Sequence, residues 1–475
     1  PLMKKTLLSL ASVAFCMALS AQTHPSITLK TAVDGKPLTL GLATSKDVAS
    51  INIDWGDGTL VPTEAIKMDD GYQTTTNVTG TAVGTGEVKI YSDDITVLDC
   101  SYRKDEAKIS ELNVSNLPAL RYLYAPTHEL TAIDLSKNTE LYLLELSNNL
   151  LENIDLTANV KLHNLTLSNN RLTAVDLSKN TELYKIYLSD NAIPTVDFSA
   201  NNKLKTVYML NCGLSSVKFG ENNTAGLLIS MNNNALTSFD GSSLTGLESL
   251  SLNNNLLTEL KLSDAFVAST AKRKTLNIMG NSFTLATLPV PGTFATATRF
   301  NYAPQRAMEV QKDFRQGDEL DLSAQTQIKG LADAPQATVF AVSNAKDEEL
   351  VAGVDYSEEG GKITFLKGQA DSLHVSMTTP AFPKFVGTKV MRTTNFYVTA
   401  TTNGVTAVGN AGPAVSVEQG ELRVSGLAEG ETVLVYSLAG ETVATRLAVG
   451  GKATVQLGHG VYVVKASGKA VKVVM

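Results

Sequence analysis

Side chains that commonly perform catalysis are scarce in this sequence. It contains five histidines and three cysteines in 475 residues. The histidines are scattered, and no HExxH motif, GxSxG motif or cysteine–histidine dyad accompanies them. Pairs of carboxylates are too common to identify a site. We therefore expect a protein that is not an enzyme and that uses no cofactor and no metal.

Positive charge is also in deficit. The chain has 40 lysines and arginines against 47 acidic residues, which gives a net charge of −7. It lacks the basic stripe that a DNA- or RNA-binding domain carries, so we expect no nucleic-acid partner. Hydrophobic residues make up 43% and charged residues 18%, a composition typical of folded domains. The length exceeds what one core can organise, so we expect several domains.

Long apolar runs are absent beyond the first twenty residues. Two lysines precede an apolar run over residues 7–19, and the small residues Ser20 and Ala21 follow. This order is that of a secretory signal peptide, which we place at residues 1–21. A transmembrane anchor would need a longer run to span ~30 Å of hydrocarbon. A lipoprotein signal at Cys16 is disfavoured by the bulky phenylalanine before it, so we expect an exported protein without a membrane anchor.

The centre of the chain repeats itself every 21 residues. Clean copies begin at Leu141, Leu162 and Leu183, and each reads L-x-x-L-x-L-x-x-N-x-L, the signature of leucine-rich repeats. Further copies begin near Leu120, Leu204, Gly226, Leu247 and Arg273, and a degenerate first copy lies around Leu98 to Ala119. One repeat cannot bury its apolar residues alone, so neighbours must stack and share a core. This predicts a mainly β fold with a leucine-rich-repeat solenoid over residues 95–290.

Two columns of asparagines recur at bends of the predicted coil. An amide can satisfy backbone groups where the chain turns away from a strand. The first column, a structural ladder in which Cys212 replaces one asparagine, is Asn149, Asn170, Asn191, Cys212, Asn234, Asn255 and Asn281. The second column is Asn138, Asn159, Asn180, Asn201 and Asn222. Bends on both sides indicate a narrow coil with extended segments on both faces and little helix; a metal site is the less favoured interpretation.

An aspartate column occupies the opposite, convex face. It consists of Asp134, Asp155, Asp176, Asp197 and Asp240. Carboxylates at ~5 Å spacing could form a calcium ladder, but solvated side chains near Lys137 and Lys179 are the favoured interpretation. Cys100 and Cys212 lie about five repeats apart, which at ~4.8 Å per strand exceeds disulfide reach. We expect both to be buried thiols.

Side chains between the inward leucines should form an exposed concave face. Tyrosine recurs there in the earlier copies, whereas the last copies are small and polar. Tyrosine offers a large contact area and is enriched at binding hot spots, although it also suits any exposed strand. The predicted ligand-binding residues are Tyr122, Tyr124, Glu145, Lys185, Tyr187 and Tyr208.

The flanks of the repeats read as β domains. Residues 22–94 alternate in hydrophobicity, and the turn from Asp54 to Gly58 resembles the turn motif of PKD-type immunoglobulin-like domains. A cation site among its carboxylates is the alternative to a simple turn. Residues 300–398 also alternate, with turn signals at Gly317 and Gly360. We expect a second immunoglobulin-like β-sandwich there.

The last segment, residues 399–475, is compact and β-rich after a polar linker. Its "VYSLAGETV" hairpin, "GVYVV" strand and terminal "KVVM" strand resemble the C-terminal sorting domain of type IX secretion cargo in Bacteroidetes. Met475 ends a strand where that family usually has Val. The whole order of segments resembles the internalin-like surface proteins of oral Bacteroidetes such as Porphyromonas.

That resemblance implies outer-membrane passage, removal of the sorting domain and attachment to surface polysaccharide. It implies partners in the secretion and sorting machinery and a protein or glycan ligand on a host or bacterial surface. Adhesion or recognition, in host attachment or biofilm, is therefore the expected function. A passive surface spacer and the targeting module of a surface enzyme remain open alternatives.

Overall fold

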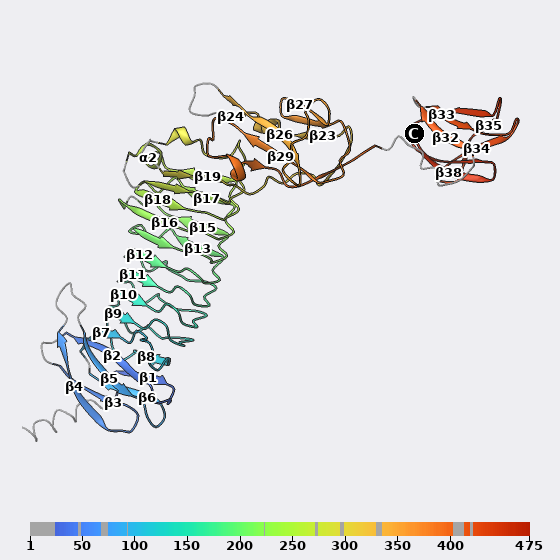
Figure 1. Cartoon of the computed structure of the whole chain (residues 1–475). Coiled ribbons are helices and arrows are strands. Elements are labelled where there is room, and N and C mark those ends of the chain that lie inside the picture. Colours follow the sequence, from blue (N-terminus) through green and yellow to red (C-terminus); the bar gives the residue numbers. More distant parts are fainter. Residues whose placement is uncertain are drawn as a thin grey trace, which may run out of the picture. The chain divides into compact units, whose positions relative to one another are not determined.

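The computed structural model describes residues 24–45, 49–67, 75–92, 94–222, 224–270, 274–294, 299–328, 335–401, 413–418 and 421–475. The expected signal peptide, residues 1–21, lies outside these residues. The described chain divides into two compact units. One contains the residues up to Glu309 with Ala324–Phe340 and Ser376–Thr393, and the other contains Val310–Ser323, Ala341–Val375 and Thr394–Met475. Strands dominate both (Figure 1).

The first β domain is built from two sets of hydrogen-bonded strands. Its strands are β1 (Ile27–Thr31), β2 (Pro37–Thr44), β3 (Ala49–Asp54), β4 (Leu60–Lys67), β5 (Thr76–Thr81) and β6 (Glu87–Tyr91). β6 pairs with β1 and β3, while β5 pairs with β2, all antiparallel. Alternation buries Ile27 and Leu29 of β1, as expected for a strand with one face on a core. The immunoglobulin-like assignment of this domain stays a prediction.

Two strands join this domain directly to the repeats. β7 (Ile95–Asp99) is antiparallel to β2 and parallel to β9 (Tyr122–Tyr124). β8 (Ile109–Asn113) is antiparallel to β1. The exposed edge of a stacked sheet would otherwise offer unpaired backbone groups. The β domain therefore caps the first turn of the solenoid by continuous hydrogen bonding.

The repeats form a β-solenoid of about nine turns. One parallel sheet contains β9, β10 (Leu143–Glu145), β11 (Asn164–Thr166), β12 (Lys185–Tyr187), β14 (Thr206–Tyr208), β16 (Leu227–Ser230), β18 (Leu247–Ser251), β20 (Thr275–Asn277) and β21 (Arg299–Asn301). Its register places Leu144 opposite Leu165 and Ile186 opposite Val207, so the inward side chains stack. We call the outer surface of β9 to β21 the sheet face.

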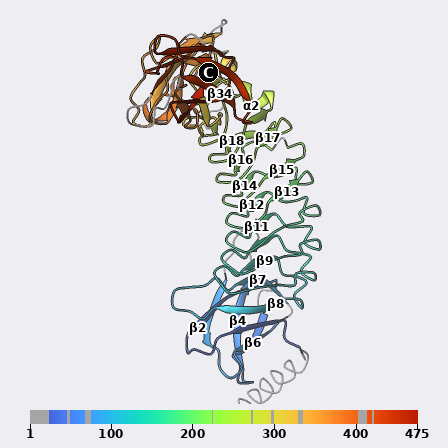
Figure 2. The same cartoon turned by 90° about the vertical axis from the view of Figure 1, so that its right-hand side faces the viewer.

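Strands of four residues each cover part of the opposite side of the coil. They are β13 (Thr195–Phe198), β15 (Ser216–Phe219), β17 (Ser238–Gly241) and β19 (Glu259–Leu262). β13 pairs with β15, and β17 pairs with β19, in parallel. Figure 2 shows β13, β15 and β17 along one edge of the coil and β14, β16 and β18 along the other. The one α-helix among the described residues, α2 (Asp264–Ala268), confirms the expected narrow coil with little helix.

The solenoid sheet extends beyond its expected end at residue 290. β21 pairs in parallel with β20, with Phe300 opposite Leu276. A chain of aromatic contacts follows at this end: Phe300 lies 4.9 Å from Tyr302, and Tyr302 lies 5.5 Å from Phe382, measured between ring centroids. These buried rings cover the last turn, and so residues 300 and 301, expected at the start of the second sandwich, belong to the solenoid.

Short strands fill the region from residue 310 to 399. They are β22 (Asp313–Arg315), β23 (Glu319–Asp321), β24 (Gln327–Ile328), β25 (Gln336–Ala337), β26 (Val339–Asn344), β27 (Tyr356–Glu359), β28 (Lys362–Phe365), β29 (Leu373–Thr378), β30 (Met391–Arg392) and β31 (Tyr397–Thr399). The 3-10 turns Ser323–Gln325 and Gly387–Lys389 lie among these strands, and a further one, Pro291–Thr293, precedes β21. β23, β28 and β27 form an antiparallel sheet. Phe314, Phe365 and Phe396 meet at 5.2–5.3 Å between ring centroids. The immunoglobulin-like assignment here also stays a prediction.

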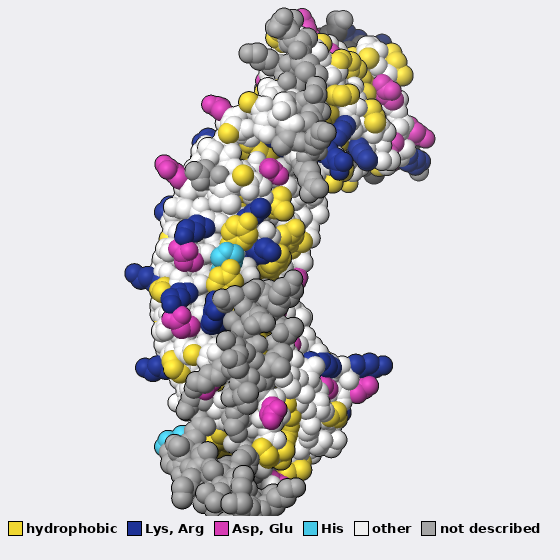
Figure 3. Space-filling view, turned by 90° about the vertical axis from the view of Figure 1, so that its left-hand side faces the viewer, with side chains coloured by type: hydrophobic (Ala, Val, Ile, Leu, Met, Phe, Trp, Pro, Cys, Tyr) yellow, Lys and Arg dark blue, Asp and Glu magenta, His cyan; other side chains and the backbone are white. Residues whose placement is uncertain are grey.

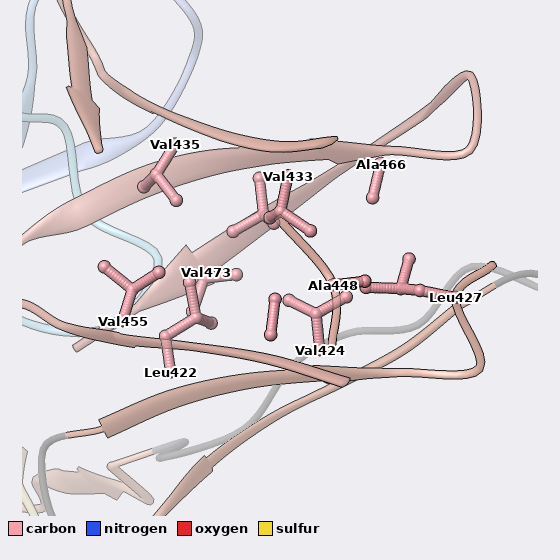
Figure 4. Packing of buried hydrophobic residues seen from close by; sticks show 11 residues of the cluster. Leu422, Val424, Leu427, Val433, Val435, Ala448, Val455, Ala466 and Val473 are labelled. Carbon is pink, nitrogen blue, oxygen red and sulfur yellow. The ribbon is translucent and has the colours of Figure 1, made fainter. Parts of the chain in front are cut away.

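The last described residues form two small antiparallel sheets. Their strands are β32 (Ala414–Glu418), β33 (Glu421–Ser425), β34 (Thr432–Ser437), β35 (Thr442–Leu447), β36 (Lys452–Gln456), β37 (Val461–Ala466) and β38 (Lys469–Val474). One sheet has the order β32-β33-β36 and the other β35-β34-β37-β38. Leu422 and Val424 of the first sheet and Val433 and Val435 of the second are fully buried (Figure 4). The "VYS", "VYVV" and "KVV" segments thus lie in strands around one core.

Candidate functional site

The sheet face is built by the alternation of each short strand. In β9, Leu123 is fully buried while Tyr122 and Tyr124 on either side are half-buried and point outward. Pairing registers then align equivalent positions of successive repeats. One column of outward positions is Tyr124, Glu145, Thr166, Tyr187, Tyr208 and Ser230, and the other is Tyr122, Leu143, Asn164, Lys185, Thr206 and Leu228. The structure therefore places all six predicted ligand-binding residues on one face.

The four predicted tyrosines form two groups on this face. Tyr187 and Tyr208 stack with ring centroids 5.3 Å apart and ring planes 15° apart. Partial burial, and then the neighbouring Tyr208, raises the pKa of Tyr187 above its ordinary value. Tyr122 and Tyr124 lie three strands away, roughly 14 Å at the usual strand spacing. A single ligand can contact both groups only if that ligand spans several repeats.

A third column joins these two groups. Its members follow the first inward leucine of successive repeats, and each backbone N–H donates to the carbonyl of the member before it, at 2.8–2.9 Å. We call it the rim column; it consists of Arg121, Tyr142, His163, Tyr184 and Lys205. These residues precede the central strand positions, so alternation within the strands did not identify them as outward. Their 21-residue spacing was the signal that could have identified them.

The rings of the rim column stand against each other. His163 lies between Tyr142 and Tyr184, 4.8 Å from each ring centroid, with ring planes 12° and 23° apart. Arg121 lies over the ring of Tyr122 at 5.7 Å, and Lys205 over that of Tyr184 at 5.8 Å. Such contacts position the cations beside the rings. On this side of the solenoid, hydrophobic, basic and some acidic side chains surround a histidine (Figure 3).

Two predicted outward residues differ in their availability. Lys185 is exposed and has no ion-pair partner among the described residues. Glu145 accepts a hydrogen bond from the Ser147 N–H at 3.0 Å, so its carboxylate is engaged within its own turn. Thr206 occupies an outward position of β14 but is only 9% exposed. Of the outward positions on β14, Tyr208 is the one that reaches solvent.

The asparagine ladder connects consecutive turns of the coil. Asn170 Oδ1 accepts from the Leu151 N–H at 3.0 Å, and its Nδ2 donates to Leu146 O at 2.9 Å and Leu167 O at 3.0 Å. Asn149, Asn191, Asn234, Asn255 and Asn281 repeat this pattern. These buried side chains hold the bend and leave nothing for a ligand.

Two positions equivalent to the ladder asparagines hold a different residue. The Cys212 thiol donates to Leu188 O at 3.3 Å, and burial raises its pKa, which keeps it protonated. His128 occupies the position one repeat before Asn149: its Nδ1 accepts from the Ile109 N–H at 3.1 Å, and its Nε2 faces Cys100 O. Burial lowers the pKa of His128, so the neutral form, which can accept at Nδ1, is favoured. Cys100 and Cys212 are both free buried thiols, as expected.

The second asparagine column acts mainly as a donor. Nδ2 of Asn159 donates to Leu135 O at 3.1 Å and to Asn138 O at 2.9 Å, and Asn180 and Asn201 repeat the arrangement one turn later. Asn222 departs from it, because its Oδ1 accepts from the Thr224 N–H at 2.8 Å. Both columns therefore have structural bonds to the backbone.

The convex aspartates form small capped bends. Asp155 Oδ1 accepts from the Thr157 N–H at 2.9 Å, and the same i to i+2 contact recurs at Asp134, Asp176, Asp197 and Asp240. These hydrogen bonds hold the pKa of each carboxyl below its ordinary value. Among the described residues, no group of three histidine, cysteine or acidic side chains is arranged to hold a metal.

The Asp54 turn and a nearby hollow are two further polar features. Asp54 Oδ1 accepts from the N–H groups of Gly56 and Gly58 at 2.8 and 2.9 Å, the pattern of a structural turn. A hollow of about 710 Å³ lies beside β1 and β8. Its wall includes Lys30 and Glu111, which pair with each other at 3.0 Å, together with the acidic residues Glu87 and Asp134. Neither feature brings aromatic rings and cations together as the rim column does.

Comparison with known proteins identifies no family. No protein-family model and no curated protein matches the chain. Among solved structures, the chain is similar to the functional domain of InlJ from Listeria monocytogenes, which includes a cysteine ladder: 17% identity, TM-score 0.43, covering 64% of this chain and 67% of that one. It is also similar to the leucine-rich repeat domain of APL1B: 18% identity, TM-score 0.30, covering 53% and 81%. Within the described residues, no helix is long and apolar enough to span a membrane.

Proposed function

We propose that this chain is an exported surface protein that recognises a protein ligand through the sheet face from β9 to β14. The observation that carries the proposal is the alignment of aromatic side chains from five consecutive repeats on this one surface. Tyr122, Tyr124, Tyr187 and Tyr208 occupy the strands, and the rim column lies beside them. Buried aromatic anchors provide most of the binding energy at protein interfaces.

Preorganisation supports a binding role for this surface. The strands are fixed by the hydrogen-bonded sheet and by the buried ladder beneath the bends. Rings that already stack against a neighbour lose little further rotamer freedom when a ligand arrives. A passive spacer requires a rigid coil but has no need for aromatic groups collected on one face. The aromatic alignment therefore favours recognition over a spacer role.

The proposal extends to location. The apolar leader of residues 7–19 and the compact β domain from β32 to β38 suit an exported protein whose last domain is a sorting signal. Adhesion to a host or bacterial surface is the function that fits this location. A glycan ligand and the targeting of a separate enzyme are less favoured, because neither explains the upright, mutually stacked rings.

An adhesion assay tests the role of the sheet face. Beads coated with the full chain are incubated with epithelial or bacterial cells, and the attached fraction is counted. Replacing Tyr187 and Tyr208 with Ser should reduce attachment without unfolding the coil, since both side chains point outward. Replacing Asp155 and Asp176 with Asn is the matched control, because Asn Oδ1 can still cap the bend. Wild-type attachment by the folded tyrosine variant would refute the proposal.

A further inference from the structure

The charged groups of the sheet face differ in sign from the chain as a whole. The chain carries a net charge of −7, yet Arg121, Lys185 and Lys205 project from β9 to β14 or their rim. None of these three has a carboxylate within ion-pairing distance among the described residues. The one acidic group in the outward columns over these repeats, Glu145, is hydrogen-bonded to Ser147. That hydrogen bond does not remove the negative charge of Glu145, so three cations against one carboxylate give these outward positions a net positive charge.

Other charges near this surface are already neutralised or lie at its margins. Lys161 pairs with Glu140, and Lys203 pairs with Glu182, each at 2.6 Å. Asp190 lies at the opposite edge of the strands and accepts a hydrogen bond from Asn211. Lys205 Cε and the Glu248 carboxylate lie 3.3 and 3.8 Å from the position that a Cβ atom on Gly226 would take, so Glu248 approaches the Lys205 end of the rim column. The unpaired positive charge is thus concentrated between β9 and β14.

Ring orientation limits the kind of ligand that can bind here. Tyr142, His163 and Tyr184 cover one another's faces at 4.8 Å, and Tyr187 covers Tyr208 at 5.3 Å. A sugar ring that stacks on an aromatic platform needs an open face, whereas both faces of His163 and one face of each tyrosine are covered by neighbouring rings. Their edges, which carry the positive part of the ring quadrupole, and their hydroxyl groups remain available. Both favour a ligand rich in acceptors and negative charge.

We propose, on the basis of the function proposed above, that the sheet face binds an extended acidic segment of a protein along the rim column from Arg121 to Lys205. These two cations are four repeats apart, roughly 19 Å at the usual strand spacing, which about six extended residues would span. Carboxylates of the segment pair with Arg121, Lys185 and Lys205, and its apolar residues pack against Tyr187 and Tyr208. Three cations over this length are too sparse to match a densely sulfated glycan.

A direct binding experiment tests this specificity. Fluorescein-labelled deca-glutamate is titrated with the full chain, and anisotropy is measured at about 25 mM and about 300 mM NaCl, where screening differs strongly. Deca-glutamine, labelled maltoheptaose and labelled heparin are the comparison probes. We expect deca-glutamate to bind best and to weaken at the higher salt concentration.

Matched variants locate the site. Replacing Arg121 and Lys205 with Gln should weaken deca-glutamate binding about three- to tenfold, as expected for the loss of two charge contacts at half-buried side chains. Replacing Lys218 and Lys261 with Gln removes the same charge from the opposite side of the coil and should leave binding nearly unchanged. An equal loss in both variants would show a long-range charge effect and overturn the assignment to the rim column.

The remaining outcomes separate this inference from the proposed function. No binding of deca-glutamate at low salt, or preferential binding of maltoheptaose or heparin, would overturn the acidic-segment inference. If cell attachment still depended on Tyr187 and Tyr208 in that case, the recognition function would stand. In the opposite outcome, deca-glutamate binds through Arg121 and Lys205 while cell attachment is unchanged by replacing Tyr187 and Tyr208. In that case only the adhesion proposal would fail.

Discussion

Replacing Asn170 with Ala should destabilise the solenoid through one identifiable hydrogen bond. In the native chain, the side chain serves the Leu151 N–H and the carbonyl oxygens of Leu146 and Leu167. Both carbonyls keep a second amide donor after the substitution: Asn149 donates to Leu146 O at 3.1 Å, and Asn191 donates to Leu167 O at 3.0 Å. The Leu151 N–H, in contrast, loses the acceptor that Asn170 supplies.

The expected loss of unfolding free energy comes mainly from the N–H group, because it loses its acceptor while the two carbonyls each keep a donor. A buried N–H group left without its acceptor costs about 1–3 kcal/mol of unfolding free energy, whereas carbonyls that keep one donor lose much less. Asn170→Asp should be worse than Ala at neutral pH. It restores an acceptor for Leu151, but it places a second, anionic oxygen against the carbonyls of Leu146 and Leu167.

The assay must report on one repeat, because a chain of several domains need not unfold in a single transition. Hydrogen–deuterium exchange of the Leu151 amide should accelerate in Asn170→Ala, and urea unfolding should show the expected loss of stability. Thr166→Ser, on the same repeat but with an outward side chain, is the control and should change little. Equal effects of the two substitutions, or an unchanged exchange rate at Leu151, would refute the reasoning.

Three further predictions concern other parts of the chain. Cys212→Asn should supply an acceptor for the Ile193 N–H and stabilise the solenoid by about 0.5–1.5 kcal/mol in urea unfolding; destabilisation would show that the thiol fits its site better. Because the folded-state pKa of His128 is lowered by burial, the unfolded chain binds the proton more readily, and stability should fall as pH drops below about 6.5. His128→Asn should remove this part of the pH dependence, and an unchanged slope would contradict it. Deletion of residues 401–475 should hold the protein in the periplasm, and wild-type surface labelling of the truncated protein would exclude a sorting role.

Repetition made much of the fold predictable. A 21-residue period with leucines at fixed offsets predicts a stacked coil because no repeat can bury its own apolar face. The same period predicts that the first-column asparagines lie at one kind of bend, where the structure places their amides against the backbone. Stacking also separates Cys100 from Cys212, which excludes a disulfide between them. These conclusions need only local geometry and the period.

Segment boundaries were harder to predict from sequence. The local sequence does not assign β7 to the first domain or to the coil, because β7 is hydrogen-bonded to both β2 and β9. The extension of the coil to β21 depends on pairing with β20 across a long connection. Such non-local pairing leaves little trace in composition or alternation.

Side-chain environment on the sheet face required the tertiary structure most of all. The sequence alone determined that tyrosines recur on outward strand positions, since alternation directs them there. It could not determine that Tyr142, His163 and Tyr184 stack, because their contacts join residues 21 positions apart through ring orientation and strand spacing. Nor could it determine that Thr206 is buried or that Glu145 is engaged. Local sequence sets the direction of each side chain, whereas the stacking of turns decides its neighbours and its available chemistry.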